Sequence, residues 1–162
     1  MRLYNRLAIR VARGVPADQQ DSITPAEMFL DEQCYALAAM LYVMDANFAA
    51  LVDVWARLPA EQWTVQQQRF AVVYDLAHDN LSVAPDMLAT PGVSPGSATR
   101  LDGALRDHAA GLVSQMTLAR RASLAEEARA AAQGMRPEGQ AGLAALLAAL
   151  TDPSCEGLCK AE

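Results

Sequence analysis

The sequence has almost no lysine, few aromatic residues and little of the β-branched content that sheets require. Lys160 is the only lysine among 162 residues, and aromatic residues make up 6% of the chain. Valine, isoleucine and threonine are scarce, whereas alanine occupies 33 positions. Because alanine is the best helix former and β-branched residues favour strands, the composition predicts a helical protein. Arginine in place of lysine, together with abundant alanine, is typical of GC-rich bacterial genomes.

Long apolar runs are also missing. The longest, from Cys34 to Met44, has 11 residues, whereas a membrane span needs about 20. The first residues lack the unbroken apolar stretch of a signal peptide, so we predict a cytoplasmic protein without a membrane span. The formal net charge of −6 argues against nucleic acid as a partner, because an acidic surface repels phosphate groups.

Cysteine is too sparse for a disulfide framework, since the chain has only Cys34, Cys155 and Cys159. Cys34 lies in an apolar run and is expected to be a buried thiol. Cys155 and Cys159 lack a second pair of ligands, so a zinc site is not indicated. Their spacing also differs from the Cys-x-x-Cys redox pattern, and whether the two pair stays open.

The clearest pattern is a heptad seam held for four repeats, which is typical of one long packed helix. The seam continues through Asp45-Ala46-Asn47, so we predict one helix over about 25–58, about 50 Å long at 1.5 Å per residue. A capping box at 24–27 begins it and Pro59 ends it. Its middle is apolar on all sides, so neighbours must cover several faces. The seam consists of Leu30, Cys34, Leu37, Leu41, Met44, Phe48, Leu51, Trp55 and Leu58.

Further helices follow after short polar segments. We expect one over about 64–84 that Pro85 ends, followed by a loop at 86–96 that is the longest in the fold and the best candidate for a mobile or binding loop. Ser97 is expected to cap the next helix, whose apolar face is Leu101, Leu105, His108, Leu112 and Met116.

At a third capping box, which begins at Ser123, either a new helix starts or one helix continues to Gln133, and we favour a bend. A final helix is expected from Pro137 to Asp152. The fold class is therefore all-α, a four- or five-helix bundle around the long helix at about 25–58. We assign a single domain over 1–162, with a basic arm and linker at 1–23, a helical bundle at 24–152 and a loose tail at 153–162.

The two histidines are weak candidates for ligand contacts. Asp75 stands three residues before His78, a spacing found in carboxylate-bridged di-metal bundles. Leu105 holds the matching position before His108, so the second pair is missing and no metal site is predicted. We interpret His78 as a histidine at the edge of the apolar face, bonded to a neighbouring acid. His108 is interpreted as a core histidine with a partner, or alternatively as a pH-sensitive contact.

The most distinctive charged feature is the arm at residues 1–14, which carries four arginines and no acid. With a net charge of −6, the rest of the chain therefore carries −10. The arm is predicted to dock on this acidic body, although binding of an acidic partner or a membrane surface is the alternative. On a helix Leu3, Leu7 and Val11 lie beside the arginines, whereas on a strand Leu3, Leu7, Ile9 and Val11 share a face, so both conformations stay open. The candidate partner-binding residues are Arg2, Arg6, Arg10 and Arg13.

No motif for catalysis, phosphate binding or a cofactor is present. By elimination we predict a non-enzymatic bacterial protein-interaction module, such as an adaptor, chaperone, inhibitor or immunity-type protein, whose partner is another protein or a second copy of itself. The alternative is a helical bundle that binds a small apolar ligand or cofactor, with His78 or His108 in contact. An enzyme ranks third.

Overall fold

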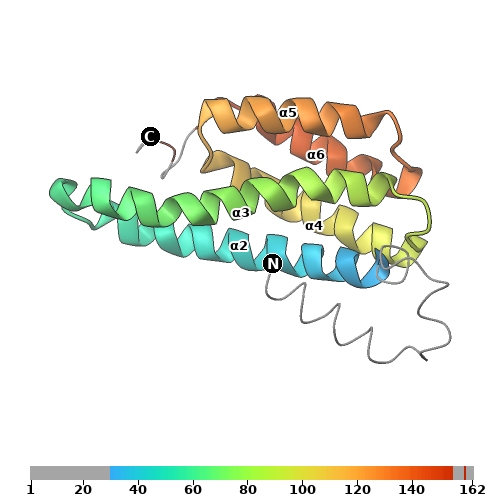
Figure 1. Ribbon diagram of the computed structural model, residues 1–162, viewed down its shortest axis with the longest axis horizontal. Helices are drawn as coiled ribbons and strands as arrows, with labels where there is room; N and C mark the ends of the chain where they lie inside the picture. Colours follow the sequence, from blue (N-terminus) through green and yellow to red (C-terminus); the bar gives the residue numbers. More distant parts are fainter. Residues whose placement is uncertain (1–29, 155–158, 160–162) are drawn as a thin grey trace, which may run out of the picture.

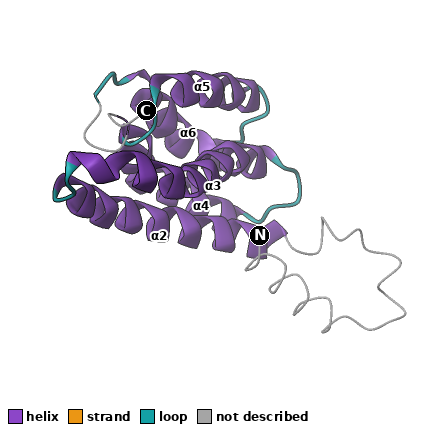
Figure 2. Ribbon diagram, turned by 60° about the vertical axis from the view of Figure 1, so that its left-hand side comes forward, coloured by secondary structure: helices purple, strands orange, loops and turns teal. Residues whose placement is uncertain are grey.

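The structure is a computed structural model that describes residues 30–154 and Cys159. Within this part the chain forms helices joined by short turns and no β-strand (Figure 2), which confirms the predicted all-α bundle. The α-helices are α2 (Leu30–Ala56), α3 (Trp63–Ala89), α4 (Pro95–Ser114), α5 (Leu118–Ala132) and α6 (Gln140–Thr151), and the 3-10 turns are Ala60–Gln62 and Pro137–Gly139.

The helices close around a common core (Figure 1). Helix α2 packs on α3 and α4, helix α6 packs on α4 and α5, and α3 packs on α5. Leucines from all five α-helices have no exposed surface, and they belong to one core cluster. On α2 this leucine is Leu41, and the other helices contribute the rest. These fully buried leucines are Leu81, Leu88, Leu101, Leu105, Leu112, Leu124 and Leu146.

Helix α2 confirms the heptad seam. It is one helix of 27 residues that continues across Asp45-Ala46-Asn47. Met44 and Phe48 are both buried, at 5% and 1% exposure, so they lie on the same packed face as the seam requires. The capping box expected at 24–27 lies outside the described residues.

Pro85 does not end its helix, contrary to the sequence-based expectation. It lies inside α3, which continues to Ala89. Leu88 is fully buried and Met87 is 8% exposed, so packing of the last turn outweighs the missing backbone donor of the proline. Arg136 also donates to the Leu88 carbonyl at 3.0 Å. The connection expected at 86–96 is consequently only residues 90–94, too short for the long binding loop we predicted.

Two helix starts also lie earlier than expected. Ser94 rather than Ser97 caps α4, because its hydroxyl accepts from the Ser97 amide and Pro95 takes the first helical position. Thr117 caps α5 by accepting from the Arg120 amide. The bend predicted at Ser123 is therefore wrong, and that residue lies within α5. Each of these serine and threonine residues is chemically able to cap a helix. Burial of the leucines of each helix decides where the helix begins and therefore which residue caps it.

The C-terminal end of α6 is held by one buried arginine. Arg121 on α5 is 3% exposed, and its guanidinium donates to the carbonyls of Met116 at 2.9 Å, Ser114 at 3.2 Å and Ser154 at 2.6 Å. It also donates to the Asp152 carbonyl. Because these bonds satisfy carbonyls that the helix ends leave free, Arg121 fixes the chain as far as Ser154.

Helices α4 and α6 approach each other closely at Gly142. The buried Asp102 carboxylate accepts from the Gly142 amide at 2.5 Å. This amide lies in the first turn of α6, where backbone donors lack partners within the helix and negative charge is favoured. A Cβ atom on Gly142 would stand 2.7 Å from the Asp102 carbonyl oxygen. The contact therefore requires glycine at this position.

We expect Gly142→Ala to lower the free energy of unfolding by about 1–3 kcal/mol, because a methyl group would separate two packed backbones. Urea denaturation measures the change. Gly103→Ala is the matched control, since its Cβ would meet only the Arg106 guanidinium at 3.9 Å, and alanine there should stabilise the helix by up to about 1 kcal/mol. Equal effects of the two substitutions would contradict the close approach.

Candidate docking groove

The partner-binding residues predicted in the arm, Arg2, Arg6, Arg10 and Arg13, lie outside the described residues. The two histidines are described, and they belong to different surfaces. His108 is on α4 and faces α2, whereas His78 is on α3 at its boundary with α5. They do not form one site.

His108 has a carboxylate partner that we did not predict. Its Nδ1 atom lies 2.9 Å from Oδ2 of Asp45 on α2, and since a carboxylate only accepts, the imidazole donates. The Tyr42 ring packs edge-on against the imidazole, with centroids 5.4 Å apart. His108 is therefore a histidine with a partner, as interpreted, but it lies at the rim of the core with its side chain 21% exposed.

Asp45 can reach α4 because residue 111 has no side chain. A Cβ atom on Gly111 would stand 2.0 Å from Oδ1 of Asp45. Next to this contact is an open cavity of about 330 Å³ between α2 and α4. Its lining combines one carboxylate, a small number of polar groups and apolar side chains: Asp45, Phe48, Ala49, Val52, Gly111, Ser114 and Gln115.

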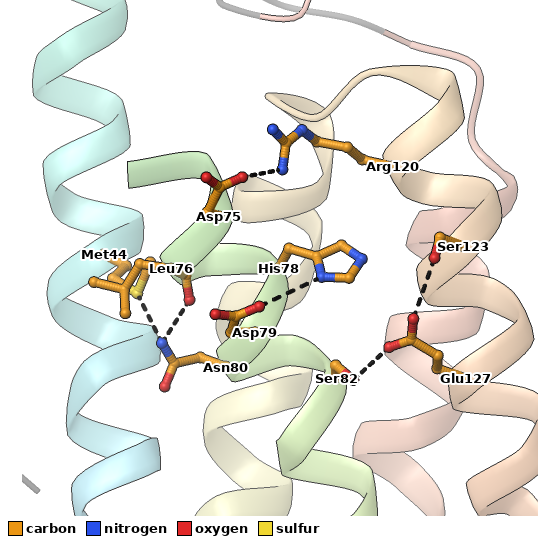
Figure 3. A network of polar contacts seen from close by, with 10 residues as sticks. All are labelled: Met44, Asp75, Leu76, His78, Asp79, Asn80, Ser82, Arg120, Ser123 and Glu127. Carbon is orange, nitrogen blue, oxygen red and sulfur yellow. Dashed lines mark hydrogen bonds and ion pairs between the residues drawn. The ribbon is translucent and has the colours of Figure 1, made fainter. Parts of the chain in front are cut away.

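The acid next to His78 is Asp79 and not Asp75. Asp75 accepts instead from Arg120 on α5 at 2.6 Å, while Nδ1 of His78 lies 3.9 Å from the Asp79 carboxylate (Figure 3). Glu127 on α5 accepts from Ser123 at 3.1 Å and from Ser82 on α3. These contacts join α3 to α5, and among the described residues no group of three His, Cys, Asp or Glu side chains could hold a metal ion.

The two described cysteines, Cys34 and Cys159, do not offer a reactive thiol. Cys34 is fully buried, and burial raises the pKa of its thiol to about 11, with the Asp31 carboxylate adding to the shift. A thiol that is protonated and inaccessible is a poor nucleophile. Cys159 is disulfide-bonded, whereas Cys155 lies outside the described residues.

Helix α2 is apolar well beyond its packed seam. Tyr35, Tyr42, Val43 and Val54 are between 47% and 61% exposed. In the described part of the chain, α2 is also the one helix long and apolar enough to cross a membrane by length and composition, which the run of 11 residues did not suggest. A core helix of a soluble protein and a signal sequence share this property.

A hollow lies between α2 and α3. This groove, the α2/α3 groove, has a volume of about 390 Å³ and is mostly apolar. Leu76 and Val83 on α3 form one wall and are 38% and 45% exposed. Leu37 and Met40 on α2 form the other wall. The complete lining is Gln33, Leu37, Met40, Leu76, Asp79, Asn80 and Val83.

The polar groups of the α2/α3 groove include two on α3 that can accept hydrogen bonds. Asn80 is only 5% exposed, and its amide nitrogen donates to the Leu76 carbonyl at 2.6 Å and lies 3.7 Å from the Met44 sulfur. Figure 3 shows the amide oxygen pointing away from both partners. Asp79 lies beside it with its side chain 76% exposed. The lining of the groove therefore includes an amide and a carboxylate, both on α3.

Sequence reasoning found the need for this surface but not its location. Because the stretch 34–44 is apolar all round, we expected neighbours to cover several faces of α2, but Tyr35, Tyr42 and Val43 are between 47% and 61% exposed. Leu76 and Val83 were not singled out, because a partner face on α3 is visible only once its register against α2 is known. Comparison with protein-family models, curated proteins and solved structures finds no match to this chain.

We expect Gly111→Ala to displace Asp45 from His108 and lower the free energy of unfolding by about 1–3 kcal/mol, because the added methyl group overlaps the carboxylate. The same substitution in an Asp45→Ala background should cost far less, since the smaller side chain leaves room. Urea denaturation of the two single variants and the double variant measures this coupling. A Gly111→Ala cost that is equal in both backgrounds would show that Asp45 does not depend on the glycine.

Proposed function

We propose that this protein is a docking module that binds an amphipathic helix in the α2/α3 groove. The observation that carries the proposal is an apolar hollow of about 390 Å³ whose walls include the exposed Leu76 and Val83. Apolar side chains on two adjacent helices form the type of surface that receives a third helix. A contiguous exposed apolar surface also marks interaction sites on soluble proteins.

The chemistry of the groove selects the kind of helix. Asp79 is its one charged lining residue, and the lining contains no basic side chain. A complementary helix therefore carries an apolar stripe for the walls and donor side chains, above all arginine, for the acidic rim.

A small apolar ligand is the second candidate, because a volume of about 390 Å³ falls within the range of ligand pockets. Neither His78 nor His108 lines the groove, so the form of this hypothesis in which a histidine contacts the ligand has no support there. The groove is open along its length, which suits a helix better than a small molecule that must be largely enclosed.

The proposal is tested with a synthetic 14-residue peptide that has leucines four residues apart and arginines beside them. Its affinity for the full chain is measured by titration calorimetry. We expect Val83→Asp and Leu76→Asp to weaken binding at least tenfold, because each places a charge against the apolar stripe. Asp79→Arg should also weaken binding by repelling the arginines.

Leu118→Asp on α5 is the matched control, because Leu118 is 71% exposed and lies outside the groove. It should bind the peptide as the unchanged protein does. A peptide of the same composition with scrambled leucines should not bind. Equal affinity for the Val83→Asp and Leu118→Asp proteins would overturn the proposal. If the protein does not bind the peptide but sediments with anionic vesicles, and Val83→Asp abolishes this sedimentation, the groove binds a membrane surface and the proposal is overturned.

A further inference from the structure

We propose that the α2/α3 groove is occupied by residues 1–14 of the same chain, so that the arm is a built-in competitor of the partner helix. This inference rests on the proposed function, since it requires that the groove receives an amphipathic helix. In the absence of a partner, residues 1–14 fill the groove, and the basic arm thereby inhibits partner binding.

The apolar spacing of the arm fits the length of the groove. As a helix, Leu3, Leu7 and Val11 form one stripe that spans about 12 Å at 1.5 Å per residue. The α3 wall from Leu76 to Val83 spans about 10 Å by the same rise. On α2 the lining runs from Gln33 to Met40, which is the same number of residues. Three anchors four residues apart therefore fill the groove and leave no wall residue uncovered.

The charges are complementary. The groove's one charged lining residue is acidic Asp79, and Asp86 follows seven residues later on the same face of α3, where it is exposed. The arm carries four arginines and no acid. On a helix these arginines lie beside the leucine stripe, so an arm seated in the groove presents them to the acidic rim.

The chain can also reach the groove. Gln33, at one end of the lining, is three residues after Leu30, where the described part of α2 begins. Residues 15–24 connect the arm to the helix start predicted at residue 25 and can span up to about 33 Å when extended. A 14-residue helix is only about 21 Å long. The connector is therefore long enough for the arm to reverse direction and lie along α2 and α3.

The consequence is regulation by competition. A segment tethered by a short connector has an effective concentration in the millimolar range. A partner helix must therefore displace the arm, and binding is selective for partners that fit the groove better than residues 1–14 do.

Zero-length cross-linking tests where the arm lies in the full chain. The variant R6K adds an amine to the arm and keeps its charge, and the only lysine of the unchanged chain is Lys160. Carbodiimide should join the new amine to Asp79 or Asp86 within one molecule, and D79N with D86N should abolish that product. Links only to acids of α5 or α6, or links between ¹⁴N- and ¹⁵N-labelled chains, would overturn the proposal.

Peptide affinity separates this inference from the proposed function. L7D should raise the affinity of the full chain for the 14-residue peptide at least tenfold, because the arm loses its central anchor. A12D is the matched control, since it adds the same charge on the opposite face of an arm helix and should change little. If L7D leaves the peptide affinity unchanged while V83D still weakens it, the groove binds helices but residues 1–14 do not occupy it. No peptide binding in any variant would refute the groove itself.

Discussion

The structure depends on how neighbouring helices bury α2, which is apolar on more than one side. Helix α2 buries its heptad seam against α3 and α4, which is the main source of hydrophobic stabilisation on that side of the bundle. Two neighbours cannot cover a helix whose middle is apolar all round. The remaining surface includes Tyr42 and Val43 on the outside and Met40 in the α2/α3 groove. The proposed docking function is a direct consequence of this incomplete cover.

Apolar burial supplies the stabilisation that packs the helices together, and polar contacts fix the positions at which they touch. Asp45 interrupts the most apolar part of the chain, and it is tolerated because His108 is its partner and Gly111 leaves space. Asp102 similarly joins α4 to the first turn of α6. Each contact couples a buried or half-buried carboxylate to a position that only glycine allows. A partner lost from such a pair leaves an unpaired polar group, which costs more than the bond contributes.

Long-range periodicity predicted the architecture, and local signals predicted the boundaries poorly. The 3-4 spacing of α2 was sufficient for a continuous helix across Asp45, because many buried residues share one phase. Pro85, Ser97 and Ser123 were misjudged because each signal is worth about 1–3 kcal/mol, less than the burial of nearby leucines. The groove and the His108 partner were not predictable, because both require the register between helices distant in sequence. The arm was identified from charge alone, and its location on the body is an inference from complementarity.

The most direct test of this account is the set of methyl–methyl nuclear Overhauser contacts of Leu7 in the full chain, with isotope labels arranged to separate contacts within a molecule from contacts between molecules. The account predicts contacts from Leu7 to Leu76 and Val83 within one chain. Leu118, which is exposed on α5, should show none. Contacts from Leu7 to α5 or α6 instead, or a Leu7 methyl with no contact to the groove, would contradict the claim that the uncovered side of α2 receives an amphipathic helix from its own chain.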